Sequence, residues 1–72
     1  MAAIRDVTIG TETIRLGQLL KLAGIAQSGG ESKALLARGV RVNGVAEVRR
    51  GRQLHGGDIV EAVGETVRVV SP

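Results

Sequence analysis

The sequence predicts an α+β fold in which two short helices pack on a small, mostly antiparallel sheet with an extra N-terminal strand. Three observations predict this class. Leucines recur at helical spacing between residues 16 and 36, a β-branched hairpin pattern surrounds Asn43-Gly44, and two more β-branched runs follow. Glycines lie at most boundaries between these segments, so we expect one domain, residues 1–72, built from short elements and tight turns.

Residues 4–14 form a β-branched segment that is interrupted by Gly10-Thr11-Glu12. This pattern fits either a short hairpin or one irregular strand. A helix is expected over residues 16–23, where four residues follow the i, i+3, i+4, i+7 spacing of an apolar stripe: Leu16, Leu19, Leu20 and Ala23. Gly24 is suited to end this helix, and Gly17 within it suggests that another backbone approaches closely.

A second helix is expected from about Gly30 to Arg38. Ser28 and Glu31 have the spacing of a capping box, in which the serine hydroxyl accepts the N–H of Glu31 and the glutamate reaches back. Gly39 ends the helix, and its inner face consists of three residues: Ser32, Leu35 and Leu36. The connection between the two helices is short, so we expect them to pack as a pair.

The clearest local signal is the run from Val40 to Val48, where β-branched residues flank Asn43-Gly44. Asn-Gly is the preferred pair for a type I′ hairpin turn. The alternation predicts that the valines face the helices and that the polar side chains, Arg41, Asn43 and Glu47, are exposed.

A basic loop, Arg49-Arg50-Gly51-Arg52, is expected after this hairpin, and Gly56-Gly57-Asp58 is expected to form a second turn. Residues 59–63 and 66–70 then read as two closing strands around Gly64-Glu65. The chain has no Phe, Tyr or Trp, so its core must be aliphatic and thin. A domain of this size buries only about 60% of its unfolded surface, which leaves little room for a deep active-site pocket.

Positive charge is concentrated in one block of the chain. The net charge is +3, but residues 33–52 alone carry +5, because Glu47 opposes six cations: Lys33, Arg38, Arg41, Arg49, Arg50 and Arg52. Lysine and arginine neutralise phosphates and release their condensed counterions, and arginine adds a planar, bidentate geometry. The block therefore points to a polyanionic partner that is held through its phosphates.

Single-stranded RNA is usually read by stacking its bases on aromatic side chains, which this chain lacks. If the polyanion is RNA, we therefore expect binding to favour the shape and backbone of structured RNA. On an ideal helix Lys33 and Arg38 lie about 140° apart, so the basic loop can approach only one of them. We expect it near Lys33.

Further contacts could come from residues outside the block. The Gly29-Gly30 step opens the second helix, and its free N–H groups could hold a phosphate, with Ser28 as the cap. Arg15 and Lys21 could extend the footprint or serve only solubility, and Asn43 serves the hairpin turn first.

Catalysis is not expected. His55 is the single histidine and there is no cysteine, so neither a Cys–His pair nor a cysteine zinc site can form. We expect no cofactor, no metal and no small-molecule substrate, with His55 and Asp58 serving a turn. The first residues have no leader-peptide pattern and no apolar run reaches membrane-spanning length, so the expected location is the cytoplasm.

Several short motifs together resemble a known family. Arg15-Leu16, Leu19-Leu20, Gly24, Ser28-Gly29-Gly30, Gly39, Val42-Asn43-Gly44 and Gly57-Asp58-Ile59 stand in the order and spacing of the S-four-type RNA-binding domain, also called the alpha-L motif. The resemblance covers about residues 14–70. The Leu19 to Gly24 and Ser28 to Lys33 runs look most like the stand-alone bacterial YbcJ-like branch.

The resemblance implies that the second helix and the following hairpin present the RNA-binding face. Contacts would fall on Lys33, Arg38, Arg41 and the arginines after the hairpin, and the partner would be ribosomal or transfer RNA, possibly in a ribosomal particle, bound by a monomer. This chain departs from the family pattern at Gly17, where Asp is common, and at Gly29, where Arg is common. It also has one residue fewer between Gly39 and the first strand valine.

Functions other than RNA binding also fit a small basic domain in part. A small protein-interaction or assembly module could use the same basic face on an acidic partner, and a DNA binder is a weaker option. A sulfur carrier of the β-grasp class would end in Gly-Gly, whereas this chain ends in Val69-Val70-Ser71-Pro72.

Overall fold

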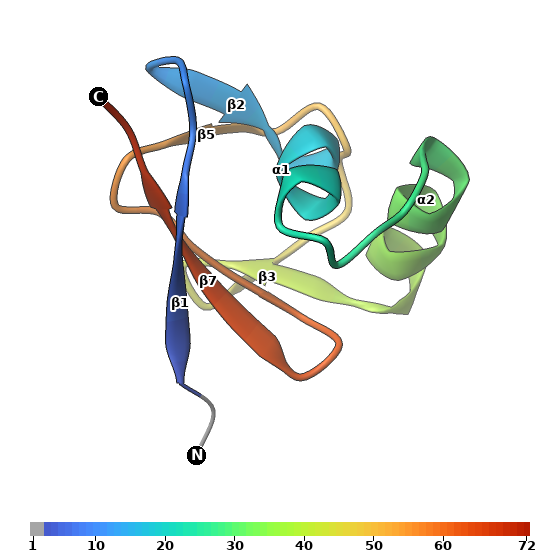
Figure 1. Cartoon of the computed structure of the whole chain (residues 1–72). Helices are drawn as coiled ribbons and strands as arrows, with labels where there is room; N and C mark the ends of the chain where they lie inside the picture. The colour runs from blue at the N-terminus through green and yellow to red at the C-terminus, as the bar shows by residue number, and fades with distance from the viewer. Residues whose placement is uncertain (1–2) are drawn as a thin grey trace.

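The computed structural model describes residues 3–72 (Figure 1). Met1 and Ala2, which begin the stretch without a leader-peptide pattern, lie outside the described residues. The elements of the described part are, in order, β1 (Ile4–Thr8), β2 (Thr13–Arg15), α1 (Leu16–Leu22), α2 (Gly29–Arg38), β3 (Val40–Val42), β4 (Val45–Glu47), β5 (Gln53–His55), β6 (Ile59–Ala62) and β7 (Glu65–Val70). The predicted α+β class is confirmed.

The main sheet has five strands in the order β1-β7-β6-β3-β4. Three of its four pairings are antiparallel, while the extra N-terminal strand β1 runs parallel to the C-terminal strand β7, with Ile4 opposite Thr66. Figure 1 shows β1 and β7 crossing the front of the molecule, with both helices on one side of them. The last strand in the order, β4, leaves one edge of the sheet open.

The prediction for residues 4–14 was wrong in both of its forms. β1 and β2 are separate strands that do not pair with each other, because β2 pairs with β5 in a second, two-stranded sheet. Thr13 lies opposite His55 and Arg15 lies opposite Gln53. This pairing brings the start of α1 next to the loop that precedes β5, which is the basic loop.

Both helices follow the predicted pattern. The stripe of α1 is buried, Gly24 adopts a positive φ of 75° directly after the C-cap Ala23, and Ser28 accepts the N–H of Glu31 at 3.2 Å. The buried face of α2 consists of Ser32, Leu35 and Leu36, and Gly39 ends the helix with a φ of 126°. β3 begins at the next residue, so this glycine makes the whole turn into the hairpin.

The core is entirely aliphatic, as predicted. Its fully buried apolar residues come from α1, from the inner faces of the strands and from Ile9 just after β1: Ile9, Leu16, Leu19, Leu20, Val40, Val42, Leu54, Val60, Val67 and Val69. Leu35 and Leu36 add the buried face of α2. The helices contact each other directly, since the buried Ser32 hydroxyl donates to the carbonyl of Gly17 at 3.3 Å. In the described part of the chain, no helix is long and apolar enough to cross a bilayer.

The turns also follow local chemistry. Asn43 and Gly44 have φ angles of 53° and 81°, as a type I′ turn requires. The closing hairpin turns one residue earlier than predicted, at Val63-Gly64, where Val63 has a φ of 45°. At the Gly56-Gly57-Asp58 turn, Asp58 accepts the N–H of His55 at 2.7 Å, and the amide of Asn43 donates to the same carboxylate. These bonds lower the pKa of Asp58, although its partial burial alone would raise it.

Candidate nucleic-acid interface

The loop at residues 48–52, between β4 and β5, is attached to the first turn of α1. The Leu16 N–H donates to the carbonyl of Arg52 at 2.8 Å and the Gly17 N–H donates to the carbonyl of Arg50 at 2.9 Å. The first N–H groups of a helix have no partners within the helix. Here loop carbonyls satisfy two of them, in a helix whose N-cap residue, Arg15, makes no side-chain capping bond.

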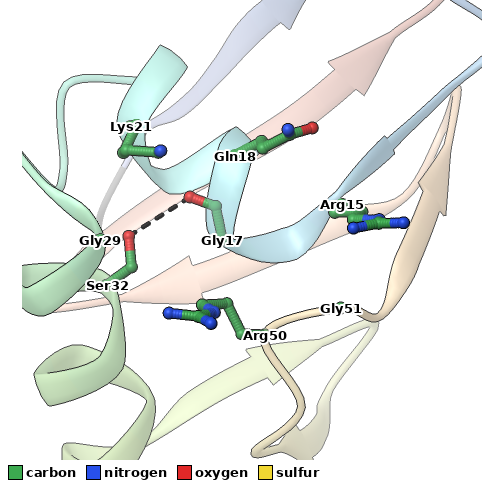
Figure 2. Close-up of a pocket in the computed structure, with 8 residues that line it drawn as sticks. All are labelled: Arg15, Gly17, Gln18, Lys21, Gly29, Ser32, Arg50 and Gly51. Atoms are coloured by element: carbon green, nitrogen blue, oxygen red, sulfur yellow. Dashed lines mark hydrogen bonds between the residues drawn. The ribbon is translucent and has the colours of Figure 1, made fainter.

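Gly17 allows the loop to lie this close. A Cβ at this position would overlap the Cγ of Arg50 and would lie 3.1 Å from its Cδ and 3.5 Å from its carbonyl oxygen. The predicted close approach of another backbone to Gly17 is therefore confirmed. The absence of a side chain leaves a passage along which Arg50 extends toward α2 (Figure 2).

The same loop is held from the other side by Glu47. Its carboxylate accepts five hydrogen bonds: Oε2 from the N–H groups of Val48 and Arg49 and from Arg49 Nε, and Oε1 from Arg49 Nη2 and Arg52 Nη1. The prediction that Glu47 is exposed was wrong, because only 7% of the residue is accessible. The prediction that the hairpin valines face the helices was wrong for Val45 and Val48, which are 66% and 75% exposed.

These bonds determine the charge state of the loop. The hydrogen bonds from the Arg49 and Arg52 side chains, followed by the N–H of Arg49, lower the pKa of Glu47 from 4.5 to about 2. The same carboxylate raises the pKa of Arg49. Glu47 is therefore ionised at neutral pH, and it offsets part of the positive charge of its two arginine partners.

Arg50 stands between these two anchors and borders two grooves. The first has a volume of about 300 Å³ and lies between α1, the start of α2 and the loop (Figure 2). Its cationic lining residues are Arg15, Lys21 and Arg50, and the others are Gly17, Gln18, Gly29, Ser32 and Gly51. Figure 2 shows the Arg50 guanidinium on the α2 side of Gly17 and Arg15 on the other side.

The second groove, of about 490 Å³, lies between α2 and the chain that follows β4. It is lined by Lys33, Leu36, Ala37, Val48 and Arg50. The expectation that the basic loop lies near Lys33 rather than Arg38 agrees with this arrangement. Arg50 is common to both grooves, and neither lining contains a carboxylate.

We call Arg15, Lys21, Lys33 and Arg50 the Arg50 cluster. Among residues 3–72, ion pairs hold four of the other arginines: Arg5 with Glu65, Arg68 with Asp6, and Arg49 and Arg52 with Glu47. No ion pair of these described residues involves a member of the cluster. Its four charges come from the end of β2, α1, α2 and the loop, and they face solvent without an acidic neighbour in the groove linings.

The remaining predicted cations lie elsewhere. Arg41 points to the outer face of the sheet, since its neighbours Val40 and Val42 are buried, and it shares a third groove with Glu61 and Glu65. Arg38 is in the last turn of α2, more than one helical turn beyond Lys33. The six cations of the central block therefore do not converge on one surface, while Arg15 and Lys21 from outside the block join Lys33 and Arg50.

Two predicted polar positions are engaged in turns. The Asn43 side chain donates to Asp58 at 3.1 Å and accepts the N–H of Ile59 at 2.9 Å, so it ties the hairpin to β6. Ser28 caps α2, and Gly29 in the first turn of that helix lines the first groove. Gly30 follows it, and a Cβ added to Gly30 would lie 3.8 Å from the Ser28 hydroxyl.

Sequence reasoning missed the role of Glu47, although a signal was present. A two-residue turn at Asn43-Gly44 pairs Val42 with Val45 and Val40 with Glu47. Residues that lie opposite each other in an antiparallel pair face the same side of the sheet. The turn prediction therefore already placed Glu47 on the side of the buried Val40. For metal binding, no group of three His, Asp or Glu side chains in residues 3–72 is arranged to hold an ion.

Comparison with known proteins agrees with this architecture. The S4 domain family model matches residues 7–70. A Bacillus subtilis protein, "Probable ribosome maturation protein RlbA", is 51% identical over 59 residues, which cover 81% of this chain and 83% of the relative. An Escherichia coli protein, "Putative RNA-binding protein YbcJ", is 37% identical over 59 residues, with 81% and 84% of the two chains covered. With a family model matched over nearly its whole length and two relatives of similar size, this chain belongs to the S4 domain family.

Proposed function

We propose that this protein binds structured RNA, without catalysing a reaction on it, and that the Arg50 cluster grips the phosphates. One observation carries the proposal: four cations from four segments border two grooves that meet at Arg50, and no carboxylate lines either groove. Phosphates are the ligands that such a surface favours, since each neutralised phosphate releases condensed counterions. Membership of the S4 domain family and the names of both relatives support RNA as the polyanion.

Ribosomal RNA is the partner that we favour over transfer RNA. The support is the name of the Bacillus subtilis relative, "Probable ribosome maturation protein RlbA". We further propose that residues 1–72 form one domain that acts as a monomer. The protein would work in the cytoplasm and without a cofactor. The start of α2 at Gly29 and Gly30 would offer N–H groups to a phosphate in the first groove, while Arg38, Arg49 and Arg52 would make outer contacts.

The salt dependence of binding tests the proposal. Four phosphate contacts predict that log K falls with log salt at a slope of about −3 to −4 on duplex RNA, since each contact contributes about −0.9. Arg50→Gln should reduce the slope by about 1 and weaken binding to all RNA sequences alike. The measurement is a fluorescence-anisotropy titration of a labelled RNA hairpin between 50 and 300 mM salt, with duplex DNA as the competitor.

Arg41→Gln is the matched control, because it removes the same charge from the outer face of the sheet. We expect this variant to bind with an unchanged slope. A slope near −1 for the unmodified protein, or equal losses in the two variants, would contradict an interface centred on Arg50. Displacement of the RNA by an acidic protein but not by other RNA would favour a protein-interaction module instead.

A further inference from the structure

Val48 is the most exposed large apolar side chain among the described residues, at 75%. It follows the edge strand β4 and forms one wall of the second groove, opposite Leu36 and Ala37 of α2. A single exposed valine is common on protein surfaces. This one is different because it lines a groove together with two other apolar residues, and the rest of the lining is cationic.

The remaining lining residues of this groove are Lys33 and Arg50. A groove lined by three apolar and two cationic side chains matches a ligand that has a flat apolar face and negative charges beside it. A nucleotide has this chemistry only when its base is unstacked, because neighbouring bases cover both faces inside a duplex. The groove, of about 490 Å³, is within the size range of small-ligand sites.

We propose that the second groove receives the base of one unstacked nucleotide, as found at a bulge or junction, while Lys33 and Arg50 hold the flanking phosphates. This inference rests on the proposed function and specifies its substrate class. Arg50 also lines the first groove, so the nucleotide would be continuous with the path of the phosphates. The planar guanidinium gives the base a stacking surface in a chain without aromatic residues.

The test compares two RNA duplexes that differ only by one additional unpaired nucleotide. The full chain should bind the bulged duplex about 5- to 10-fold more tightly, a difference of about 1 to 1.4 kcal/mol. Val48→Ser should remove this preference and leave binding to the uninterrupted duplex unchanged. The substitution is on the surface, so the fold should be retained, which circular dichroism and the unfolding temperature will check.

Val45→Ser is the matched control. Val45 is 66% exposed on the edge strand β4, three residues before Val48, but it does not line the groove, so this variant should keep the preference for the bulge. Equal affinity of the unmodified protein for both duplexes would overturn the inference and leave the proposed function standing. A preference that survives in Val48→Ser would also overturn it, because the unpaired base would then bind outside this groove. Failure to bind either duplex would refute the proposed function itself.

Discussion

Replacing Glu47 by glutamine separates two accounts of the basic loop that predict opposite results. In Glu47, Oε1 accepts two hydrogen bonds and Oε2 accepts three, and all five come from N–H groups. Glutamine keeps one acceptor oxygen and places an NH₂ group at the other position. At least two of the five bonds are therefore lost, and donors then face donors.

If charge alone governed binding, Glu47→Gln would strengthen it, because the net charge rises by one and Arg49 and Arg52 are released. Each arginine that gained a phosphate would steepen the salt slope by about 0.9. The structure predicts the reverse. In Glu47→Gln, residues 48–52 lose hydrogen bonds that hold them in place. Arg50 is then no longer ordered in the free protein and must be ordered when RNA binds. Ordering one long side chain costs about 0.5 to 1.5 kcal/mol, which corresponds to a roughly 2- to 13-fold higher Kd.

The assay is an RNA titration at constant salt, with Glu61→Gln as the control for charge. Glu61 lies on β6 between the buried residues Val60 and Ala62, so it faces the outer side of the sheet, away from the loop. Glu61→Gln changes the net charge by the same amount as Glu47→Gln, and the affinity of this variant for RNA should be unchanged or slightly higher. Hydrogen exchange at the Val48 and Arg49 amides should accelerate in Glu47→Gln alone. Binding by Glu47→Gln as tight as that of Glu61→Gln would refute the reasoning.

Three further predictions concern the fold and the passage for Arg50. The pKa of Glu47 is about 2 in the folded chain against 4.5 ordinarily, so the unfolded chain takes up the proton first as the pH falls. The stability that this group contributes is present above about pH 4.5 and is lost as the pH falls toward 2. Acid denaturation followed by circular dichroism should therefore show a smaller loss of stability in Glu47→Gln. Gly17→Ala should gain up to about 1 kcal/mol of helix propensity but displace Arg50, so RNA titrations should show weaker binding. Gly10→Ala, where an added Cβ meets no atom within 4 Å and which lies outside both groove linings, should bind normally. Leu20→Ala, at a fully buried site, should cost about 2 to 5 kcal/mol in urea unfolding, a large part of the about 4 to 11 kcal/mol expected for a domain of this length.

Local elements could be predicted from the sequence because their signals are local. The stripe of α1, the Ser28 cap and the Asn43-Gly44 turn each depend on residues within a few positions of one another, and all three are present. The pairing of β2 with β5 could not be predicted in this way. Its two strands have three residues each and lie far apart in the sequence, so no local signal indicates that they pair.

The candidate site was predicted only in part for a related reason. Counting charges along the chain grouped Arg41 with Arg50, although strand alternation sends Arg41 to the outer face. It also left Arg15 and Lys21 as minor positions, while the fold brings both to the groove beside Arg50. A sum over a sequence window does not register which face a residue occupies, and it does not identify the carboxylate that holds two of the arginines.

The parallel pairing of the first and last strands has a consequence for how this molecule assembles. Ile4 meets Thr66, a partner 62 positions along the chain, and Thr13 meets His55, 42 positions away. Such distant partners raise the contact order, which slows folding relative to helical bundles of similar size. During synthesis, β1 must wait without its partner until residues 65–70 have emerged from the ribosome.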